Sequence, residues 1–162
     1  MTDISAGLLV AKAKEQLPYT HKVYEMLHQN PEPSGEERQT AAFIRQELAA
    51  LGLDTTPVLD NGTLALLDTG RPGKTLLLRA DIDALPVQED ECNLSGKKPL
   101  VSGKPGVCHA CGHDGHAAMA LGAMRVLHAL RQQLAGSVLF LFESGEERGG
   151  LTKDAIRAAL RE

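Results

Sequence analysis

The sequence of 162 residues contains no tryptophan, and aromatic residues make up only 3% of it. A core must therefore be built mainly from leucine, alanine, valine and isoleucine, for which an apolar content of 43% is ordinary. No apolar run approaches the roughly 20 residues that cross a bilayer, so we expect no association with membranes. The net charge is only −4 and there is no basic stripe, which argues against a nucleic-acid partner.

Cysteine is also scarce. Cys92, Cys108 and Cys111 are an odd number of thiols, so they cannot all pair within the chain. The N-terminus, MTDISAGLLVAKAKEQ, lacks the basic start, long apolar middle and cleavage site of a secretory signal. Both features favour reduced thiols and a cytoplasmic location.

Apolar residues follow a helical period in some segments and a strand period in others. The expected helices lie at residues 5–29, 34–52, 113–133 and 153–161. The expected strands lie at residues 55–59, 63–68, 75–78 and 137–142. Turn residues between the first two strands predict a hairpin. This alternation of helix and strand predicts an α/β fold, in which a mixed sheet is layered with helices.

Three local signals refine this outline. Pro18 should break or bend the first helix, because proline lacks a backbone N–H. Ser34 and Glu37 have the spacing of a capping box at the start of the second helix, and Gly52 is a natural stop at its end. The third strand, 75–78, has no polar alternation, so we expect it to be buried on both faces.

The densest group of metal-binding side chains lies in the sequence VCHACGHDGH, residues 107–116. Cys111 and His113 are separated by one residue, so a tight loop could direct both at one ion. Cys108 and Cys111 also form a Cys-x-x-Cys, which leaves a redox pair or a structural zinc site open as an alternative. A structural zinc site would need a second ligand pair, and none has suitable spacing.

Charged residues follow two of the expected strands. Asp81 comes shortly after residues 75–78, and Glu146 and Glu147 come shortly after residues 137–142. Open α/β sheets bind ligands at the carboxyl ends of their strands. Adjacent carboxylates can divide the work, one binding a metal while the other acts as a general base. The sequence therefore predicts metal-assisted hydrolysis, although the charges around Asp81 could equally pair with one another.

Three segments in this order, RADIDALP, GVCHACGHDGHAAMALGA and FLFESGEERGG, resemble the aminoacylase/carboxypeptidase-type metallopeptidase family. The matching branch is the amidohydrolases, which include hippurate hydrolase, indole-acetyl-amino-acid hydrolases and N-acetyl-diaminopimelate deacetylase. The resemblance runs over essentially the whole chain. It implies a zinc-peptidase-like catalytic α/β domain with a two-metal site, and a smaller lid and dimerisation domain that is absent from this sequence.

The resemblance also implies roles for single residues. Cys111, His113 and Glu147 stand at metal-ligand positions, and Glu146 stands at the position of the general base. Two divalent ions are implied, and mixed Cys, His and carboxylate ligation admits zinc, manganese, cobalt or nickel. Arg79 stands where other relatives have a metal-binding histidine, so we expect it not to bind metal. Asp81 stands where those relatives have an orienting aspartate and is a candidate catalytic residue.

The activity implied by the resemblance is hydrolysis of an amide bond in N-acyl amino acids or short peptides, by a parent enzyme that is a homodimer. Relatives are longer and supply two further histidine ligands. Residues 1–162 are therefore expected to form the N-terminal part of the catalytic domain, and to be weakly active or inactive alone. Two alternatives remain: a non-catalytic module or subunit completed by another chain, and a structural-zinc or redox module.

Overall fold

A computed structural model describes residues 4–59 and 61–148 of the chain. The helices are α1 Ala6–Gln29, α2 Arg38–Ala50 and α3 His113–Leu130, with short 3-10 helices η1 Arg131–Gln133 and η2 Glu146–Arg148. The strands are β1 Thr55–Val58, β2 Gly62–Asp68, β3 Thr75–Asp81, β4 Cys92–Asn93, β5 Gly96–Lys97 and β6 Ser137–Glu143. The helix expected at 153–161 lies outside the described residues. None of the described helices has the length and hydropathy needed to cross a membrane.

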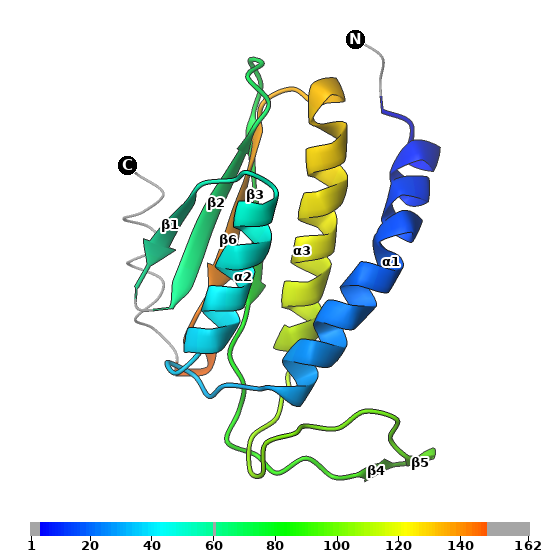
Figure 1. The fold of residues 1–162 in the computed structure, drawn as a ribbon, viewed down its shortest axis with the longest axis vertical. Helices are drawn as coiled ribbons and strands as arrows, with labels where there is room; N and C mark the ends of the chain where they lie inside the picture. Colours follow the sequence, from blue (N-terminus) through cyan, green and yellow to red (C-terminus); the bar gives the residue numbers. More distant parts are fainter. Residues whose placement is uncertain (1–3, 60, 149–162) are drawn as a thin grey trace.

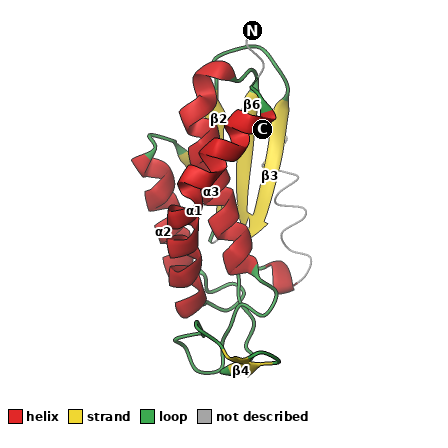
Figure 2. Ribbon diagram, turned by 90° about the vertical axis from the view of Figure 1, so that its right-hand side faces the viewer, coloured by secondary structure: helices red, strands yellow, loops and turns green. Residues whose placement is uncertain are grey.

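The main sheet has the strand order β1-β2-β6-β3 and is mixed. The predicted hairpin is confirmed, because β1 and β2 pair antiparallel; β6 then pairs antiparallel with β2 and parallel with β3. Helices α1, α2 and α3 lie together on one face of this sheet (Figures 1 and 2). The predicted α/β class with a helix-layered mixed sheet is confirmed.

The core lies between the three helices and the sheet. Its largest fully buried apolar side chains come from α2, α3 and the strands β2 and β6, together with the segment that follows β3: Phe140, Phe142, Ile44, Leu48, Leu67, Ile82, Leu121 and Met124. The two phenylalanines stand on the interior strand β6, where each fills a large volume of the core. Met119 on α3 does not join this core and is 60% exposed.

The expectation that residues 75–78 are buried on both faces was wrong. Leu76 and Leu77 are 56% and 41% exposed. In the described part of the chain, β3 stands at the edge of the sheet and pairs only with β6. An unbroken leucine run does not distinguish a strand covered by two layers from one covered by a single layer, which is why the pattern misled.

Helix α1 does not break at Pro18. An interior proline removes one backbone hydrogen bond and costs about 3 kcal/mol or more. The helix lies along α3 for much of its length (Figure 1), so packing offsets this cost. The helix begins where Ser5 Oγ accepts the N–H of Leu8 at 3.2 Å.

The predicted capping box of α2 was also wrong. Within residues 4–59 and 61–148, Ser34 Oγ has no hydrogen-bond partner and no side-chain cap comes from Glu37. The carboxylate of Glu32 instead accepts the N–H groups of Gln39 and Thr40, at 3.1 and 2.7 Å. A carboxylate therefore does satisfy the first turn of the helix, but it comes from two residues before Ser34.

The end of α2 agrees with the sequence. Gly52 has a φ of +72°, and its N–H donates to Ala49 O at 2.8 Å. The N–H of Leu53 reaches back to Leu48 O at 3.2 Å. This pair of bonds is the Schellman arrangement, which needs a left-handed residue and so favours glycine.

Candidate metal centre

Three segments meet at one edge of the sheet. Because β3 and β6 run parallel with Asp81 opposite Glu143, their carboxyl ends lie side by side. The loop that contains Cys111 leads into α3, whose first residue is His113. Gly112, with a φ of +80°, provides the left-handed backbone between them. Residues that are far apart in the sequence are thus placed around one point.

The three predicted metal ligands come together. The sulfur of Cys111, a ring nitrogen of His113 and a carboxylate oxygen of Glu147 all lie within 4.8 Å of one another. Zinc binds such donors at about 2.0–2.3 Å, so the three would draw slightly closer around an ion. A soft thiolate, an imidazole and a carboxylate form a donor set that suits a divalent transition metal.

The imidazole of His113 is held in one orientation. Its Nδ1 lies 2.9 Å from the carbonyl oxygen of Asp83 and 3.1 Å from the Oδ1 of the same residue. Both partners are acceptors, so Nδ1 carries the proton and the lone pair of a neutral ring is on Nε2. Nε2 faces Glu147 Oε1 at 3.9 Å, which is the direction a metal ligand requires.

Cys111 is exposed and lies in an acidic environment. A hydrogen bond to Glu147, desolvation and the charges of Glu147, Glu146 and Asp81 raise the pKa of the Cys111 thiol to about 11. The same negative charges that hold the proton on this sulfur attract a cation. The acidic environment is therefore compatible with a cation site and does not favour a free thiolate nucleophile.

Glu146 stands beside this group of donors without being one of them. Its Oε2 lies 4.0 Å from His113 Nε2 and its Oε1 lies 3.9 Å from Arg79 Nη2. Its side chain is half-exposed, so water can reach it. A carboxylate adjacent to a ligand group, and accessible to water, is placed as a general base should be.

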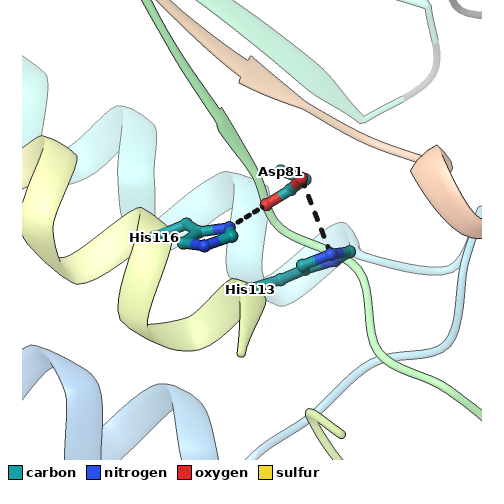
Figure 3. Close-up of side chains that lie close together, drawn as sticks. All are labelled: Asp81, His113 and His116. Atoms are coloured by element: carbon teal, nitrogen blue, oxygen red, sulfur yellow. Dashed lines mark hydrogen bonds and ion pairs between the residues drawn. The ribbon is translucent and has the colours of Figure 1, made fainter. Parts of the chain in front are cut away.

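Asp81 is buried and bonded on several sides. Its Oδ1 accepts from His116 Nδ1 at 2.6 Å, and its Oδ2 lies 3.0 Å from Arg79 Nη1 and 3.5 Å from His113 Nε2. Figure 3 shows both imidazoles of α3 turned towards this carboxylate. Burial would raise the pKa of Asp81, but the His116 hydrogen bond and the charges of His113 and Arg79 outweigh it and hold the pKa below its usual range. Asp81 is therefore ionised.

Asp81, His113 and His116 form a second group whose geometry could hold an ion. It shares His113 with the first group. One Nε2 lone pair binds one ion, so the two groups compete for this ring.

Arg79 cannot ligate a metal, since a guanidinium has no free lone pair. Its Nε donates to Glu143 Oε2 at 2.5 Å, and its other nitrogens reach Asp81 and Glu146. This arginine neutralises part of the acidic cluster and ties the ends of β3 and β6 together. That Arg79 binds no metal stays a prediction.

Cys108 lies apart from the donor groups. It is buried, and its backbone pairs with Leu85 in an isolated bridge. Burial is the main cause that raises the pKa of its thiol. Among the described residues, neither group of possible metal donors includes Cys108. These facts weaken the interpretation of Cys108 and Cys111 as a shared zinc or redox pair.

Two further buried carboxylates, Asp83 and Glu37, lie at the site. From the sequence, Asp83 was only one of the charges that follow the third strand, and Glu37 was expected to cap a helix. Asp83 stands in the RADIDALP segment, where its position after β3 was the available signal. Glu37 stands in the turn before α2, and its side chain contacts a residue 108 positions later. No local pattern around Glu37 carries that information.

Comparison with known proteins identifies the family of the chain. Residues 77–161 match the family described as Peptidase family M20/M25/M40. The chain is 41% identical over 139 residues to an IAA-amino acid hydrolase ILR1-like 2 of Arabidopsis thaliana, which covers 85% of this chain and 30% of that protein. It is 40% identical over 122 residues to an N-acyl-L-amino acid amidohydrolase of Geobacillus stearothermophilus, covering 75% of this chain and 32% of that protein.

A solved structure is similar as well. The Bacillus subtilis YXEP protein, described as a dinuclear metal binding peptidase from the M20 family, superposes with a TM-score of 0.78 at 33% identity. The match covers 93% of this chain and 40% of that one. The chain therefore belongs to peptidase family M20/M25/M40, and the predicted family is confirmed. It spans about a third of the length of the curated relatives that it matches.

Proposed function

We propose that this chain carries part of the catalytic site of a metal-dependent amidohydrolase, which cleaves the amide bond of N-acyl amino acids or short peptides. The observation that carries the proposal is the meeting of Cys111, His113 and Glu147 beside the half-exposed carboxylate of Glu146. The names of the relatives, an IAA-amino acid hydrolase and an N-acyl-L-amino acid amidohydrolase, support this substrate class.

The residues fit a divalent ion on chemical grounds. Cys111 Sγ, His113 Nε2 and a Glu147 oxygen would hold it, and the hydrogen bonds at His113 Nδ1 leave Nε2 free for this purpose. When bound, such an ion polarises a carbonyl group and makes water more acidic. Three protein donors are few for a catalytic pair of ions, so we propose that the 162-residue chain alone holds one ion and turns over little substrate.

Glu146 would accept the proton of the attacking water and later deliver it to the leaving amine. The half-exposed side chain of Glu146 and its 4.0 Å distance from His113 Nε2 support this role. Asp81, which stays ionised, would orient His116 and Arg79 through its two oxygens and leave proton transfer to Glu146.

Cobalt(II) titration of the 162-residue chain tests the ligand set. A thiolate-to-cobalt charge-transfer absorption should appear with one ion per chain, and Cys111→Ser should remove it. The matched control is Cys92→Ser, since Cys92 is an exposed free thiol in β4. Charge-transfer absorption that survives in C111S, or that disappears in C92S, would contradict the assignment.

The two glutamates can be separated by their effects. Glu147→Gln should weaken cobalt binding by about 10-fold or more because it removes a ligand, whereas Glu146→Gln should leave the affinity within about twofold. In a full-length enzyme containing this sequence, Glu146→Gln should abolish turnover. Normal turnover in that variant would sink the role of Glu146, and saturable, chelator-sensitive amidase activity of the 162-residue chain would sink its predicted inactivity.

A further inference from the structure

The turn that carries Glu146 and Glu147 is held by two buried carboxylates. The N–H of Gly145 donates to Glu37 Oε1 at 2.8 Å, and the N–H of Glu147 donates to Asp83 Oδ2 at 2.9 Å. These two bonds lie on either side of Glu146. The backbone of the turn is therefore fixed immediately before and immediately after the residue that we propose as the general base.

Both carboxylates are almost completely excluded from water. Glu37 is 0% exposed and Asp83 is 1% exposed. Within residues 4–59 and 61–148, no lysine or arginine forms an ion pair with either one. Glu37 also accepts the N–H of Gly35 at 2.8 Å and bonds Asn61 Nδ2 at 3.2 Å. Amide donors thus stabilise its buried charge.

Burying a carboxylate is costly, and an apolar replacement of similar volume often leaves a protein equally stable or more so. Stability alone is therefore a weak reason for two such groups to stand beside one turn. The two carboxylates fix the orientation of the turn, because one oxygen of each accepts a particular backbone N–H at hydrogen-bond distance. This favours a role in geometry.

Asp83 has a second contact that points to the same role. Its Oδ1 and its carbonyl oxygen both face His113 Nδ1, while its Oδ2 holds the backbone of Glu147. One residue is therefore bonded to two of the three candidate ligands, which stand 34 positions apart in the chain. Partners of this kind fix the tautomer and orientation of a metal-binding histidine.

We propose that Asp83 and Glu37 are positioning residues of the metal centre. Asp83 fixes the Nδ1–H tautomer of His113, and together Asp83 and Glu37 fix the turn that carries Glu146 and Glu147. The inference rests on the proposed function for its purpose, but its first test requires no metal.

The tautomer of His113 can be read in the metal-free chain by long-range proton–nitrogen NMR on histidine labelled with nitrogen-15. The wild-type chain should show the proton on Nδ1. Asp83→Asn should give a mixture of the two tautomers, because an amide NH2, which only donates, can take the place of the carboxylate oxygen that accepts from Nδ1. The matched control Asp54→Asn changes an exposed aspartate far along the chain from Asp83 and His113 and should leave the wild-type pattern. A proton on Nε2 in the wild-type chain would overturn the inference, even if the variant did not fold.

Hydrogen exchange tests the turn in the same metal-free chain. The amides of Gly145 and Glu147 should exchange at least about 10-fold more slowly than in an unfolded peptide of the same sequence. In Glu37→Gln the protection of Gly145 should fall, while the exposed neighbour variant Glu36→Gln should keep it. Unprotected amides in the wild-type chain would contradict the proposal that Glu37 and Asp83 fix this turn.

Cobalt affinity tests whether Asp83 also affects the metal centre. Asp83→Asn should weaken binding by about 10- to 100-fold and change the charge-transfer spectrum, whereas Asp54→Asn should do neither. A purely structural role predicts a lower melting temperature with unchanged affinity and spectrum in the folded variant, which would overturn the proposal. Failure of the wild-type chain to bind cobalt would instead refute the proposed function, and the NMR result on His113 would still decide the role of Asp83.

Discussion

His28 Nδ1 lies 2.7 Å from Asp114 Oδ2, although 86 positions separate the two residues in the sequence. Both are buried, and the other ring nitrogen of His28 lies 3.3 Å from Glu89 Oε2. One imidazole with a carboxylate at each nitrogen thus joins the end of α1, the start of α3 and the loop of residues 87–106. The loop that leads to Cys111 is anchored to the helices through this contact.

Glu89 should make the stability of the chain depend on pH. Burial would raise the pKa of Glu89, but hydrogen bonds from the Ser102 N–H and the Lys98 ammonium outweigh it, so the pKa lies below its usual range. Because the folded pKa is below the unfolded value of about 4.3, the stabilisation is present above that value. It is lost as the pH falls through the folded pKa.

We therefore expect Glu89→Gln to lower the free energy of unfolding by about 1–3 kcal/mol at pH 7. The difference from wild type should shrink as the pH falls below about 4. Urea unfolding at a series of pH values measures it. Glu91→Gln, at an exposed position nearby, is the control. A difference that stayed constant down to pH 3 would show that hydrogen bonding or packing, without ionisation, explains the effect.

The close contact between α1 and α3 can be tested with two substitutions, one of which should offset the loss of stability caused by the other. A Cβ at Gly122 would lie 2.4 Å from Thr20 Oγ1, while the other atoms of Thr20 would be at 3.6 Å or more. Gly122→Ala alone should destabilise by about 1–3 kcal/mol through overpacking. In a Thr20→Ala background the same change should be neutral or stabilising by up to about 1 kcal/mol, because alanine favours the helix. Additive effects in thermal unfolding would exclude this close approach.

The cap of α2 can be tested directly. Glu32→Ala should destabilise by about 1 kcal/mol, since it removes the acceptor of two N–H groups in the first turn. Ser34→Ala should be nearly neutral, because Ser34 Oγ has no hydrogen-bond partner in the described part of the chain. Chemical denaturation of both variants measures the contrast. The reverse order of effects would restore the capping box expected from the sequence.

Arg79 should oppose cation binding while it shapes the site. Arg79→Gln removes a positive charge 3.0 Å from Asp81 Oδ2 and should increase cobalt affinity by about 2- to 10-fold at low salt. The gain should diminish as salt is added, because the guanidinium is partly exposed and screening is effective there. Lys14→Gln, which removes an exposed charge on α1, is the charge-matched control. Weaker binding in R79Q would mean that Arg79 mainly supports the geometry of the carboxylates.

Much of the fold could be predicted from the sequence because its signals are local. Turn residues around Asn61 predicted the hairpin, and Gly52 marked the end of α2. The exposure of Leu77 could not be predicted in this way, since a run of leucines has the same pattern under one layer of helices or two. The cap of α2 was misjudged because Ser34 matches a motif while Glu32, just upstream, makes the bonds.

The same division applies to the candidate site. Cys111 and His113 are close in sequence, and Glu147 follows a strand, so their meeting was predictable, while their role as ligands stays a prediction. The partners of Glu37 and Asp83 were not predictable. Those bonds span 108 and 64 positions and exist only once the sheet has formed.

The strand order β1-β2-β6-β3 also determines the order in which the strands can pair during folding. Strands β2 and β3 are neighbours along the chain but are separated in the sheet by β6, which is the last strand of the described residues. Among the described strands β3 pairs only with β6, so during synthesis this pairing must wait until residues 137–143 have emerged. Pairings of such long range are slow to form. Glu147 reaches Asp83 and His113 only after that insertion, so within residues 4–59 and 61–148 the group of Cys111, His113 and Glu147 is completed only after β6 has paired.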